Sequence, residues 1–351
     1  MKRGRENSSA GRTVDLVRLA EIVEQFSGKR VVLYGDFVAD EFRYGDISRV
    51  SREAPVLILK HREAKLVPGG GANATNNLAA LGAKVLPVTA VGNDAAGELL
   101  TEYFRERGVD TSGIVRVANW TTPTKTRFLA GWAHTTAQQV LRVDREPDVA
   151  VPDKAKAQLA AKLSAKLRNA NALAISDYGF GAADPQAAKR ALQSVKSKIP
   201  VTLDARHGLA RYAESGIGFA TPNEAELEAI HHVAIGKKVD ELERCGLLTR
   251  ASMKLEALIV TRGRDGMALF EREGKRLTQI PVHGSDQAID VTGAGDTVLA
   301  TFTLALAGGA SALEAAHVAN IAGGLVVMKR GTATVSQAEL LETIRRESSG
   351  S

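Results

Sequence analysis

Cysteine is almost absent from this sequence. Cys245 is the only one among 351 residues, which excludes an internal disulfide bond and any metal site built from several cysteines. It lies in the segment DELERCGLLTR, whose pattern predicts a helix, so we expect a structural role for its side chain.

Long apolar segments are missing as well. No run of about eighteen apolar residues occurs, so no transmembrane helix is predicted. The first twelve residues, MKRGRENSSAGR, lack the apolar core of a signal peptide. We therefore expect a cytoplasmic protein with no membrane partner.

The net charge of +6 is a weak argument for a nucleic-acid partner. Four cations, Lys2, Arg3, Arg5 and Arg12, against Glu6 place +3 of it in the first twelve residues, where we expect a disordered tail. No basic motif rich in aromatic residues follows this tail. We therefore interpret the charge as solvation and attraction for anionic substrates, and we expect no nucleic-acid partner.

The chain has enough apolar residues to build a large core. Hydrophobic residues make up 44% and charged residues 25%, the usual balance of a globular protein. From residue 153 onward, apolar strand segments alternate with helical segments of about ten to fifteen residues, which predicts parallel strands with helices on both faces. The predicted fold class is α/β: a doubly wound, mostly parallel central sheet flanked by helices.

Two strand-rich segments interrupt this alternation, at about 41–66 and 124–145. We predict that they form a small β lid, which the extended segment 114–120 could also join. The lid favours a homodimer, because small exposed sheets need their edges covered, although a monomer stays open. We divide the chain into a basic tail with an N-terminal helix, 1–28, and one large domain, 29–347. Near the C-terminus, 266–273 and 275–282 are predicted to form a hairpin.

The stretch IDVTGAGDTVLATFTLAL, residues 289–306, carries the strongest chemical signal. Gly293 and Gly295 allow close approach of the backbone to a ligand just before an apolar helix begins. Free N–H groups at a helix start suit a phosphoryl group, and Asp296 stands there to accept a proton. The simpler interpretation is a tight turn with Asp296 as a helix cap.

Two common phosphate-binding loops are disfavoured. Valine occupies position 298, where a dinucleotide-binding turn would have a third glycine or alanine. No Gly-Lys pair, at 28–29, 236–237 or 274–275, is followed by Ser or Thr, so a Walker A loop is absent. A phosphotransferase with this sequence would use another architecture.

Asp290-Val-Thr-Gly-Ala-Gly-Asp296-Thr resembles the C-terminal signature of the ribokinase-like (pfkB-type) carbohydrate kinases, and Gly69-Gly-Gly-Ala-Asn73 resembles their N-terminal glycine signature. Ile175-Ser-Asp-Tyr-Gly179, Thr221-Pro-Asn-Glu-Ala-Glu226 and Val260-Thr-Arg-Gly-Arg-Asp-Gly266 lie between them where such a kinase has them. The resemblance covers about residues 29–340. It implies ATP-dependent phosphorylation of a sugar hydroxyl.

Within that family, three segments resemble the D-glycero-D-manno-heptose 7-phosphate kinase branch: Gly35-Asp36, Tyr44-Gly-Asp-Ile-Ser-Arg-Val-Ser-Arg-Glu-Ala-Pro-Val56 and Gly331-Thr-Ala-Thr-Val-Ser336. This branch often carries a fused nucleotidyltransferase domain. No His-x-Gly-His motif occurs here, so we expect nucleotide activation of the product to reside on another protein. Alternative acceptors are a hexose, a pentose, a ketose phosphate or a nucleoside, and a non-catalytic sugar or nucleotide sensor is a further alternative.

The resemblance implies roles for matching residues. Asp296 would be the catalytic base, with an anion hole made by the amides of Gly293, Ala294 and Gly295. Asp36 lies at the carboxyl end of a strand, where parallel sheets bind ligands, although a plain turn role is an equal alternative. The residues expected to bind the sugar or its phosphate are Asp36, Gly69, Gly70, Asn73, Lys125 and Arg127.

On the nucleotide side, the residues expected to bind ATP are Asp204, Asn223, Thr261, Gly263, Gly266 and Asn320. Asn223 and Glu226, three apart on one face of a helix start, would organise Mg²⁺ and its waters around the phosphates. The alternatives are a capping role for Glu226 and a packing role for Asn320. The residues that resemble the family's monovalent-cation site, and so suggest K⁺, are Asp290, Thr292 and Gly331.

One segment departs from the heptose kinase pattern. Asp204-Ala-Arg-His207 stands where those kinases usually read Asp-Pro-Lys-Gly. Arg206 keeps the positive charge but presents it differently from lysine, and the loss of proline and glycine changes the loop backbone. We therefore expect altered nucleotide or substrate preference. The cations available in the lid for a phosphorylated sugar are Arg49, Arg52, Lys125, Arg127 and Arg142, and the alternative for each is a solvated surface charge or a salt bridge of the fold.

Overall fold

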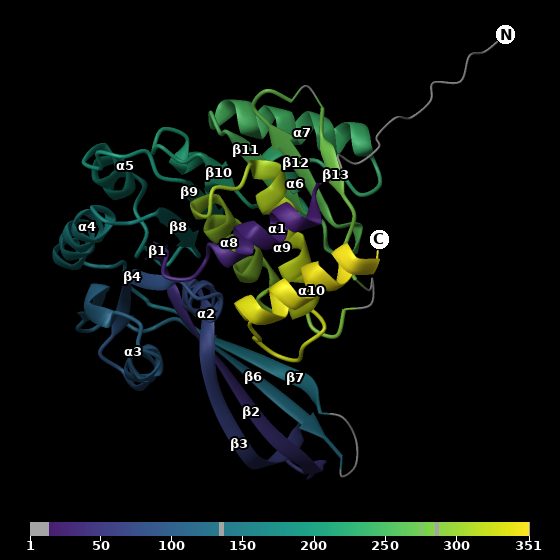
Figure 1. Cartoon of the computed structure of the whole chain (residues 1–351). Helices are drawn as coiled ribbons and strands as arrows, with labels where there is room; N and C mark the ends of the chain where they lie inside the picture. The colour runs from purple at the N-terminus through teal and green to yellow at the C-terminus, as the bar shows by residue number, and fades with distance from the viewer. Residues whose placement is uncertain (1–13, 133–136, 275, 285–287, 351) are drawn as a thin grey trace.

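The computed structural model describes residues 14–132, 137–274, 276–284 and 288–350. Across these residues the chain forms one nine-stranded sheet and one four-stranded sheet, with helices packed on the larger one (Figure 1). The basic tail expected at residues 1–12 lies outside the described residues. Within the described ranges, none of the helices combines the length and hydrophobicity that a membrane span requires.

The central sheet confirms the predicted fold class. Its order is β13-β12-β11-β10-β9-β8-β1-β4-β5, and the neighbours from β11 to β5 are all parallel. Strands such as β1 and β8 are short continuous apolar runs, as expected when helices cover both faces. The bounds are β1 Arg30–Gly35, β4 Lys84–Gly92, β5 Ile114–Val117, β8 Ala172–Asp177, β9 Val201–Ala205, β10 Phe219–Ala220, β11 Ala257–Thr261, β12 Met267–Glu271 and β13 Thr278–Ile280.

The two predictions for the irregular strands have different outcomes. The C-terminal hairpin is confirmed, because β12 pairs antiparallel with β13. The suggestion that segment 114–120 joins the lid is wrong, because β5 pairs parallel with β4 in the central sheet. A helix precedes β5, and such a crossover returns the chain to the parent sheet. Val115 and Val117 are buried there against the hydrophobic core. The thin lid has no such core to cover them.

Helices cover both faces of the central sheet and create two cores. Successive residues of β1 point to opposite faces, so Val31 and Leu33 enter one core while Val32 and Tyr34 enter the other. The first core lies against α1, α2, α3, α8, α9 and α10, and the second against α4, α5, α6 and α7. The bounds are α1 Leu16–Glu24, α2 Gly71–Ala80, α3 Ala95–Glu106, α4 Asp153–Leu167, α5 Pro185–Gln193, α6 Glu224–His231, α7 Val239–Ser252, α8 Ala294–Ala307, α9 Ala312–Val326 and α10 Gln337–Gly350.

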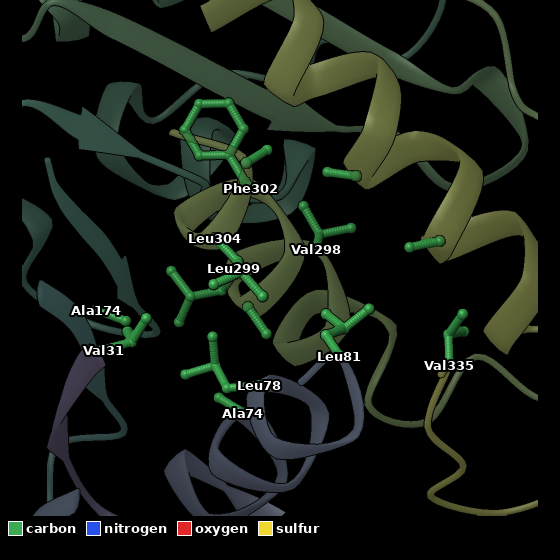
Figure 2. Packing of buried hydrophobic residues seen from close by; sticks show 14 of the residues in the cluster. Val31, Ala74, Leu78, Leu81, Ala174, Val298, Leu299, Phe302, Leu304 and Val335 are labelled. Atoms are coloured by element: carbon green, nitrogen blue, oxygen red, sulfur yellow. The ribbon is translucent and has the colours of Figure 1, made fainter. Parts of the chain in front are cut away.

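Helix α8 is the centre of the first core. Figure 2 shows its side chains Val298, Leu299 and Phe302 among apolar residues of α2 and the central sheet. Ten successive residues of α8, from Asp296 to Ala305, are buried, so the helix is enclosed on all sides. Its first turn is therefore held rigidly at the carboxyl edge of the sheet.

The N-terminal helix belongs to this same packed unit. Leu19, Ile22 and Val23 of α1 are fully buried in the first core. The Gln337 side chain of α10 donates a hydrogen bond to the Val23 carbonyl at 2.7 Å, and Arg345 pairs with Glu24 at 2.6 Å. Helix α1 and the large domain are thus joined by their packing.

The four-stranded sheet is the lid, with the order β3-β2-β6-β7. It extends away from the central sheet (Figure 1). Strands β2 and β3 reach beyond the predicted segment 41–66, whereas β6 and β7 begin and end at the predicted bounds 124 and 145. Strand β2 begins directly after β1, and β3 runs directly into α2, so the base of the lid is continuous with the carboxyl edge of the sheet. The bounds are β2 Phe37–Val50, β3 Leu57–Gly70, β6 Thr124–Gly131 and β7 Gln138–Arg145.

Candidate active site

The two glycine segments, more than two hundred residues apart in the sequence, meet at the carboxyl edge of the sheet. Asn73 lies in the first turn of α2 and Asp296 in the first turn of α8. The Asn73 Nδ2 group donates a hydrogen bond to Asp296 Oδ2 at 2.8 Å. The carboxylate therefore stands beside the residues expected to bind the sugar.

Asp296 is buried, with 4% of its surface exposed, and its two oxygens accept from different side chains. Oδ2 accepts from Asn73, and Oδ1 accepts from the Tyr178 hydroxyl at 3.0 Å. Burial raises the pKa of Asp296 to about 7, against the opposite effect of these two hydrogen bonds. A carboxylate with a pKa near neutral is well matched to general-base catalysis.

Gly293 is required by the turn before α8. Its φ of 80° lies in the left-handed region, and a Cβ atom there would overlap the Asn73 side-chain amide. Gly293 and Gly295 line the adjacent cavity, whereas the Ala294 N–H donates to the Val291 carbonyl at 3.2 Å. Two of the three predicted anion-hole residues therefore face the cavity. The role of Ala294 stays a prediction.

A polar cavity of about 360 Å³ opens beside this turn. It collects several residues expected to bind the nucleotide at the carboxyl ends of β9, β10 and β11, the edge at which parallel sheets bind ligands. The lining residues are Tyr178, Asp204, Arg206, Thr221, Asn223, Glu226, Thr261, Val291, Gly293 and Gly295. Gly263, Gly266 and Asn320 are not part of this lining.

Asn320 instead anchors the chain after β13. Its side chain is 7% exposed, and Nδ2 donates to the Pro281 carbonyl at 2.7 Å. Gly263 and Gly266 belong to the turn between β11 and β12, where both adopt positive φ angles of 55° and 77°. Their nucleotide-binding roles stay predictions.

Asn223 and Glu226 form a reciprocal cap at the start of α6. Asn223 Oδ1 accepts from the Glu226 amide at 2.8 Å, and Glu226 Oε2 accepts from the Asn223 amide at 2.9 Å. Burial raises the pKa of Asp204 well above its ordinary value, and the Glu226 and Asp296 charges add to this effect. Burial also raises the pKa of Glu226. Crowded carboxylates beside an amide form an oxygen-rich set that fits Mg²⁺.

That set supplies too few protein side chains to hold a metal ion alone. Among the residues that the structure describes, no three His, Cys, Asp or Glu side chains are grouped closely enough to bind a metal. This sparseness is typical of Mg²⁺ sites that are completed by waters and by substrate phosphates.

A second cavity, of about 530 Å³, lies on the lid side of Tyr178. Its basic residues come from three separate segments, Lys125 on β6, Arg142 on β7, and Arg206 with His207 after β9, and the acids Asp144, Glu146 and Asp148 line it as well. Burial lowers the pKa of Lys125, and the Arg206 and Arg142 charges contribute in the same direction. Because Arg142 is paired with Asp144, with 2.7 Å between Nε and Oδ1, Lys125 and Arg206 are the cations of this lining that suit an anionic ligand.

The other lid cations are placed differently. Arg127 forms a buried ion pair with Asp40, with 2.6 Å between Nη1 and Oδ1, so its charge is already matched. Gly69 makes room for this pair, because a Cβ atom there would approach Asp40 Oδ2 to 2.6 Å. Arg49 and Arg52 are exposed on the lid, outside the linings of both cavities.

Asp36 organises a loop in this structure. Its side chain is 1% exposed and accepts from the amides of Tyr178, Phe180 and Ala182 at 2.8–3.0 Å. Burial raises the pKa of Asp36 to about 6, with the Asp177 charge as the next contribution. The three amides fix the loop after β8, and a direct contact of Asp36 with a sugar stays a prediction.

The three residues of the suggested monovalent-cation site lie together. Asp290 Oδ1 accepts from the Thr292 amide and Oδ2 from the Gly331 amide, both at 2.9 Å. Although burial opposes it, these amide hydrogen bonds lower the pKa of Asp290. The carboxylate thereby stays charged and connects the turn before α8 with the loop after α9.

The comparisons with known proteins assign the family. Residues 29–339 match the sequence profile described as pfkB family carbohydrate kinase. The chain belongs to this family. It is therefore a phosphotransferase that acts on carbohydrate, and the resemblance inferred from the two glycine signatures is confirmed.

Similar curated proteins include two bifunctional proteins. "Bifunctional protein HldE" of Paramagnetospirillum magneticum is 38% identical over 95% of the kinase and 67% of its own length. "Bifunctional protein HldE" of Caulobacter vibrioides is 39% identical over 92% of the kinase and 65% of its own length. The kinase thus spans about two thirds of the length of these relatives.

Solved structures with the same fold include two sugar kinases. Phosphofructokinase-2 from Escherichia coli, solved in complex with potassium, superimposes with a TM-score of 0.72 at 20% identity, covering 92% of the kinase and 99% of that chain. Arabidopsis thaliana ribokinase, complexed with ribose and ATP, gives 0.69 at 21% identity, covering 91% and 99%. At these identities the likeness shows the fold alone.

Sequence reasoning gave no role to two residues that contact predicted site residues, Tyr178 against Asp296 and Asp40 against Arg127. Tyr178 was visible only as a member of the segment Ile175–Gly179, which ends a strand and therefore lies at the ligand edge. Asp40 carried no signal, because its partner Arg127 is 87 residues away and meets it only through the pairing of β2 with β6. Arg206 was noticed only as a departure from the family pattern.

Proposed function

We propose that this kinase transfers the γ-phosphoryl group of ATP to a hydroxyl of heptose 7-phosphate, giving heptose 1,7-bisphosphate. The observation that carries the proposal is the contact of Asn73 with Asp296, which joins the sugar-side glycine segment to the base. The heptose acceptor is supported by the segments that resemble the heptose kinase branch and by similarity to the HldE proteins.

In the proposed reaction, Asp296 accepts the proton of the acceptor hydroxyl. The hydroxyl oxygen then forms a bond to the γ-phosphorus, and the bond from that phosphorus to the bridging oxygen breaks, so ADP leaves with the electron pair. The amides at the start of α8, at Gly293 and Gly295, stabilise the charge that builds up on the transferred group. Thr261 lines the ATP side of the cavity.

Two cations would support this chemistry. Asn223 and Glu226 would hold Mg²⁺ through its waters; when bound, the ion neutralises charge on the ATP phosphates. Asp290, Thr292 and Gly331 would form the K⁺ site. The potassium complex of phosphofructokinase-2 is a property of that protein and serves here only as support by shared fold.

The lid-side cavity supports a phosphorylated acceptor. Lys125 and Arg206 reach it from separate segments, and Tyr178 and Arg206 line both this cavity and the one on the nucleotide side. Because Arg206 belongs to both linings, its replacement of the usual lysine places a broader charged group between the two substrates. A phosphate on the acceptor would lie against Lys125 and Arg206.

The proposal is tested by ADP release with Mg²⁺, ATP and a panel of acceptors. Heptose 7-phosphate should give the highest kcat/KM among heptose, hexose, pentose and ketose phosphates and nucleosides. Asp296→Asn should lower kcat by roughly 10²–10⁴-fold while ATP binding survives, because only the proton acceptor is removed. A preference for another acceptor would overturn the heptose assignment, and full turnover by Asp296→Asn would overturn the base.

We further propose a homodimer formed through the lids. The exposed apolar side chains of the lid are Val50, Val56, Leu57, Trp132, Val140, Leu141 and Val143. Several exposed apolar side chains on one small sheet favour a protein interface, and a second lid would also cover the outer strands β3 and β7.

A further inference from the structure

Tyr178 stands between the two cavities of the site. It is the first residue after β8, and it lines both the nucleotide-side cavity and the lid-side cavity. The reacting atoms of the two substrates must meet beside such a residue.

Its position is fixed from several directions. The Tyr178 amide donates to Asp36 Oδ2 at 2.9 Å, which holds the backbone. The ring packs against Gly70, where an added Cβ atom would lie 3.2 Å from Tyr178 Cε2. Lys125 Nζ lies 5.1 Å from the ring centroid, so a cation covers the ring. The hydroxyl is thereby aimed with little freedom.

That hydroxyl is aimed at the proposed base. Its distance to Asp296 Oδ1 is 3.0 Å, and Asn73 occupies the other oxygen at 2.8 Å. An ionised carboxylate only accepts hydrogen bonds, so Tyr178 is the donor. Each carboxylate oxygen keeps one further lone pair, which is available for the proton of an acceptor hydroxyl.

We propose that Tyr178 is a positioning residue, whose hydroxyl orients the Asp296 carboxylate and keeps it in the form that accepts a proton. The inference rests on the proposed function, because it needs Asp296 to act as the base. In the proposed step the acceptor proton moves to Asp296, and Tyr178 keeps its own proton throughout.

The charges around Asp296 come from several elements. Asp40 on β2 and Asp204 on β9 disfavour its ionised form, and Lys125 on β6 favours it. Burial raises the pKa of Tyr178 well above its ordinary value, and the Asp296 charge is the next largest cause of this increase. The phenol therefore stays protonated and acts as a donor. Without this donor, the pKa of Asp296 should rise above 7.

Tyr178→Phe removes one oxygen and keeps the ring that packs against Gly70. Loss of a hydrogen bond to a charged group should move the acidic limb of the kcat/KM profile upward by about one pH unit. Relative to the native kinase, turnover should fall roughly tenfold at pH 6 and less than twofold at pH 9. A role confined to packing predicts the same loss at every pH.

Tyr212→Phe is the matched control. Tyr212 is also a buried tyrosine that donates to a carboxylate of this region, Asp177 Oδ2 at 2.8 Å, but it does not contact Asp296. This variant should keep the native pH profile even if it is less stable. An unshifted profile for Tyr178→Phe, or an equal shift for Tyr212→Phe, would overturn the inference.

Failure of the inference is distinguishable from failure of the proposed function. Full turnover by Asp296→Asn would overturn the assignment of Asp296 as the base. If Asp296→Asn is inactive and the pH profile of Tyr178→Phe is unshifted, only the role of Tyr178 is overturned. Infrared difference spectra of native protein against Asp296→Asn give a readout without turnover. The tyrosine C–O band should shift when the charged acceptor is replaced by a neutral amide, and an unchanged band contradicts the inference even if Tyr178→Phe does not fold.

Discussion

At the scale of single residues, the proposed base is a carboxylate that the fold holds at a cost in stability. Asp296 is almost completely buried, and burial raises its pKa to about 7 from an ordinary value of 3.8. Two hydrogen bonds compensate only part of the lost hydration. Burial of Asp296 is therefore the cause both of the raised pKa that suits a base and of the loss in stability.

This cost predicts that Asp296→Asn stabilises the protein at alkaline pH. Between about pH 4 and pH 7 the folded chain keeps a proton that the unfolded chain releases, so the contribution of Asp296 to stability falls as the pH rises through this window. At pH 8 the neutral variant should be about 2–4 kcal/mol more stable. Below pH 4 the difference should vanish. Denaturant midpoints measured from pH 3 to pH 9 check this.

Asp110→Asn supplies a control of opposite sign. Although burial opposes it, hydrogen bonds from Lys166 and Ser112 lower the pKa of Asp110 to about 2. Asp110 therefore stabilises the folded chain above its unfolded pKa, and this contribution is lost as the pH falls toward 2. The variant should be less stable at pH 8. A lower midpoint for Asp296→Asn at pH 8 would contradict the account of a costly buried carboxylate.

At the scale of elements, the site depends on a polar seam between two apolar helices. Asn77 Nδ2 donates to the Asn73 side chain at 3.2 Å, and Asn77 Oδ1 accepts from Thr297 at 3.0 Å. Thr297 follows Asp296 directly in α8. Because side chains in an apolar contact can slide past one another, these directional bonds set how α2 and α8 align.

Asn77→Ala should therefore affect both stability and turnover. Removal of this buried amide leaves the Asn73 and Thr297 groups without one partner, at a cost of about 1–3 kcal/mol. With Asn73 less well held, kcat should fall while the KM for ATP changes little. Thr75→Ala is the control, since among the residues that the structure describes the buried Thr75 hydroxyl bonds only to the Gly71 carbonyl within α2. Equal losses of kcat in both variants would show that the seam has no special role.

The sequence was most informative where one element determines its own structure. Buried strands such as β1 and the turn before α8 are encoded by short patterns of apolar residues and glycine. The sequence suggested the wrong sheet for β5, because a strand of four residues with alternating burial fits either sheet. Which sheet it joins depends on the core that packs against it. Contacts such as Asp40 with Arg127 depend on strand register, which no local pattern contains.

At the scale of the whole molecule, the lid is an extension of the active site. Strand β2 leaves the sheet just after Asp36, and β3 returns through Gly69 and Gly70 into α2. Gly70 has a φ of 55° and packs against the Tyr178 ring, so the junction of lid and helix is also a wall of the site. A contact that orders the lid would therefore also order the residues around the base.

The proposed homodimer places that ordering contact between two lids, and Leu141→Lys should disrupt it. Leu141 on β7 is 55% exposed, and a charge there cannot be buried against a second apolar lid without a partner. The native kinase should sediment as a dimer at micromolar concentration and Leu141→Lys as a monomer with reduced kcat/KM. Leu99→Lys on α3, at a residue 53% exposed but outside the lid, should stay dimeric and active. A monomeric native protein, or dimers of Leu141→Lys as stable as the native ones, would place the interface elsewhere or exclude it.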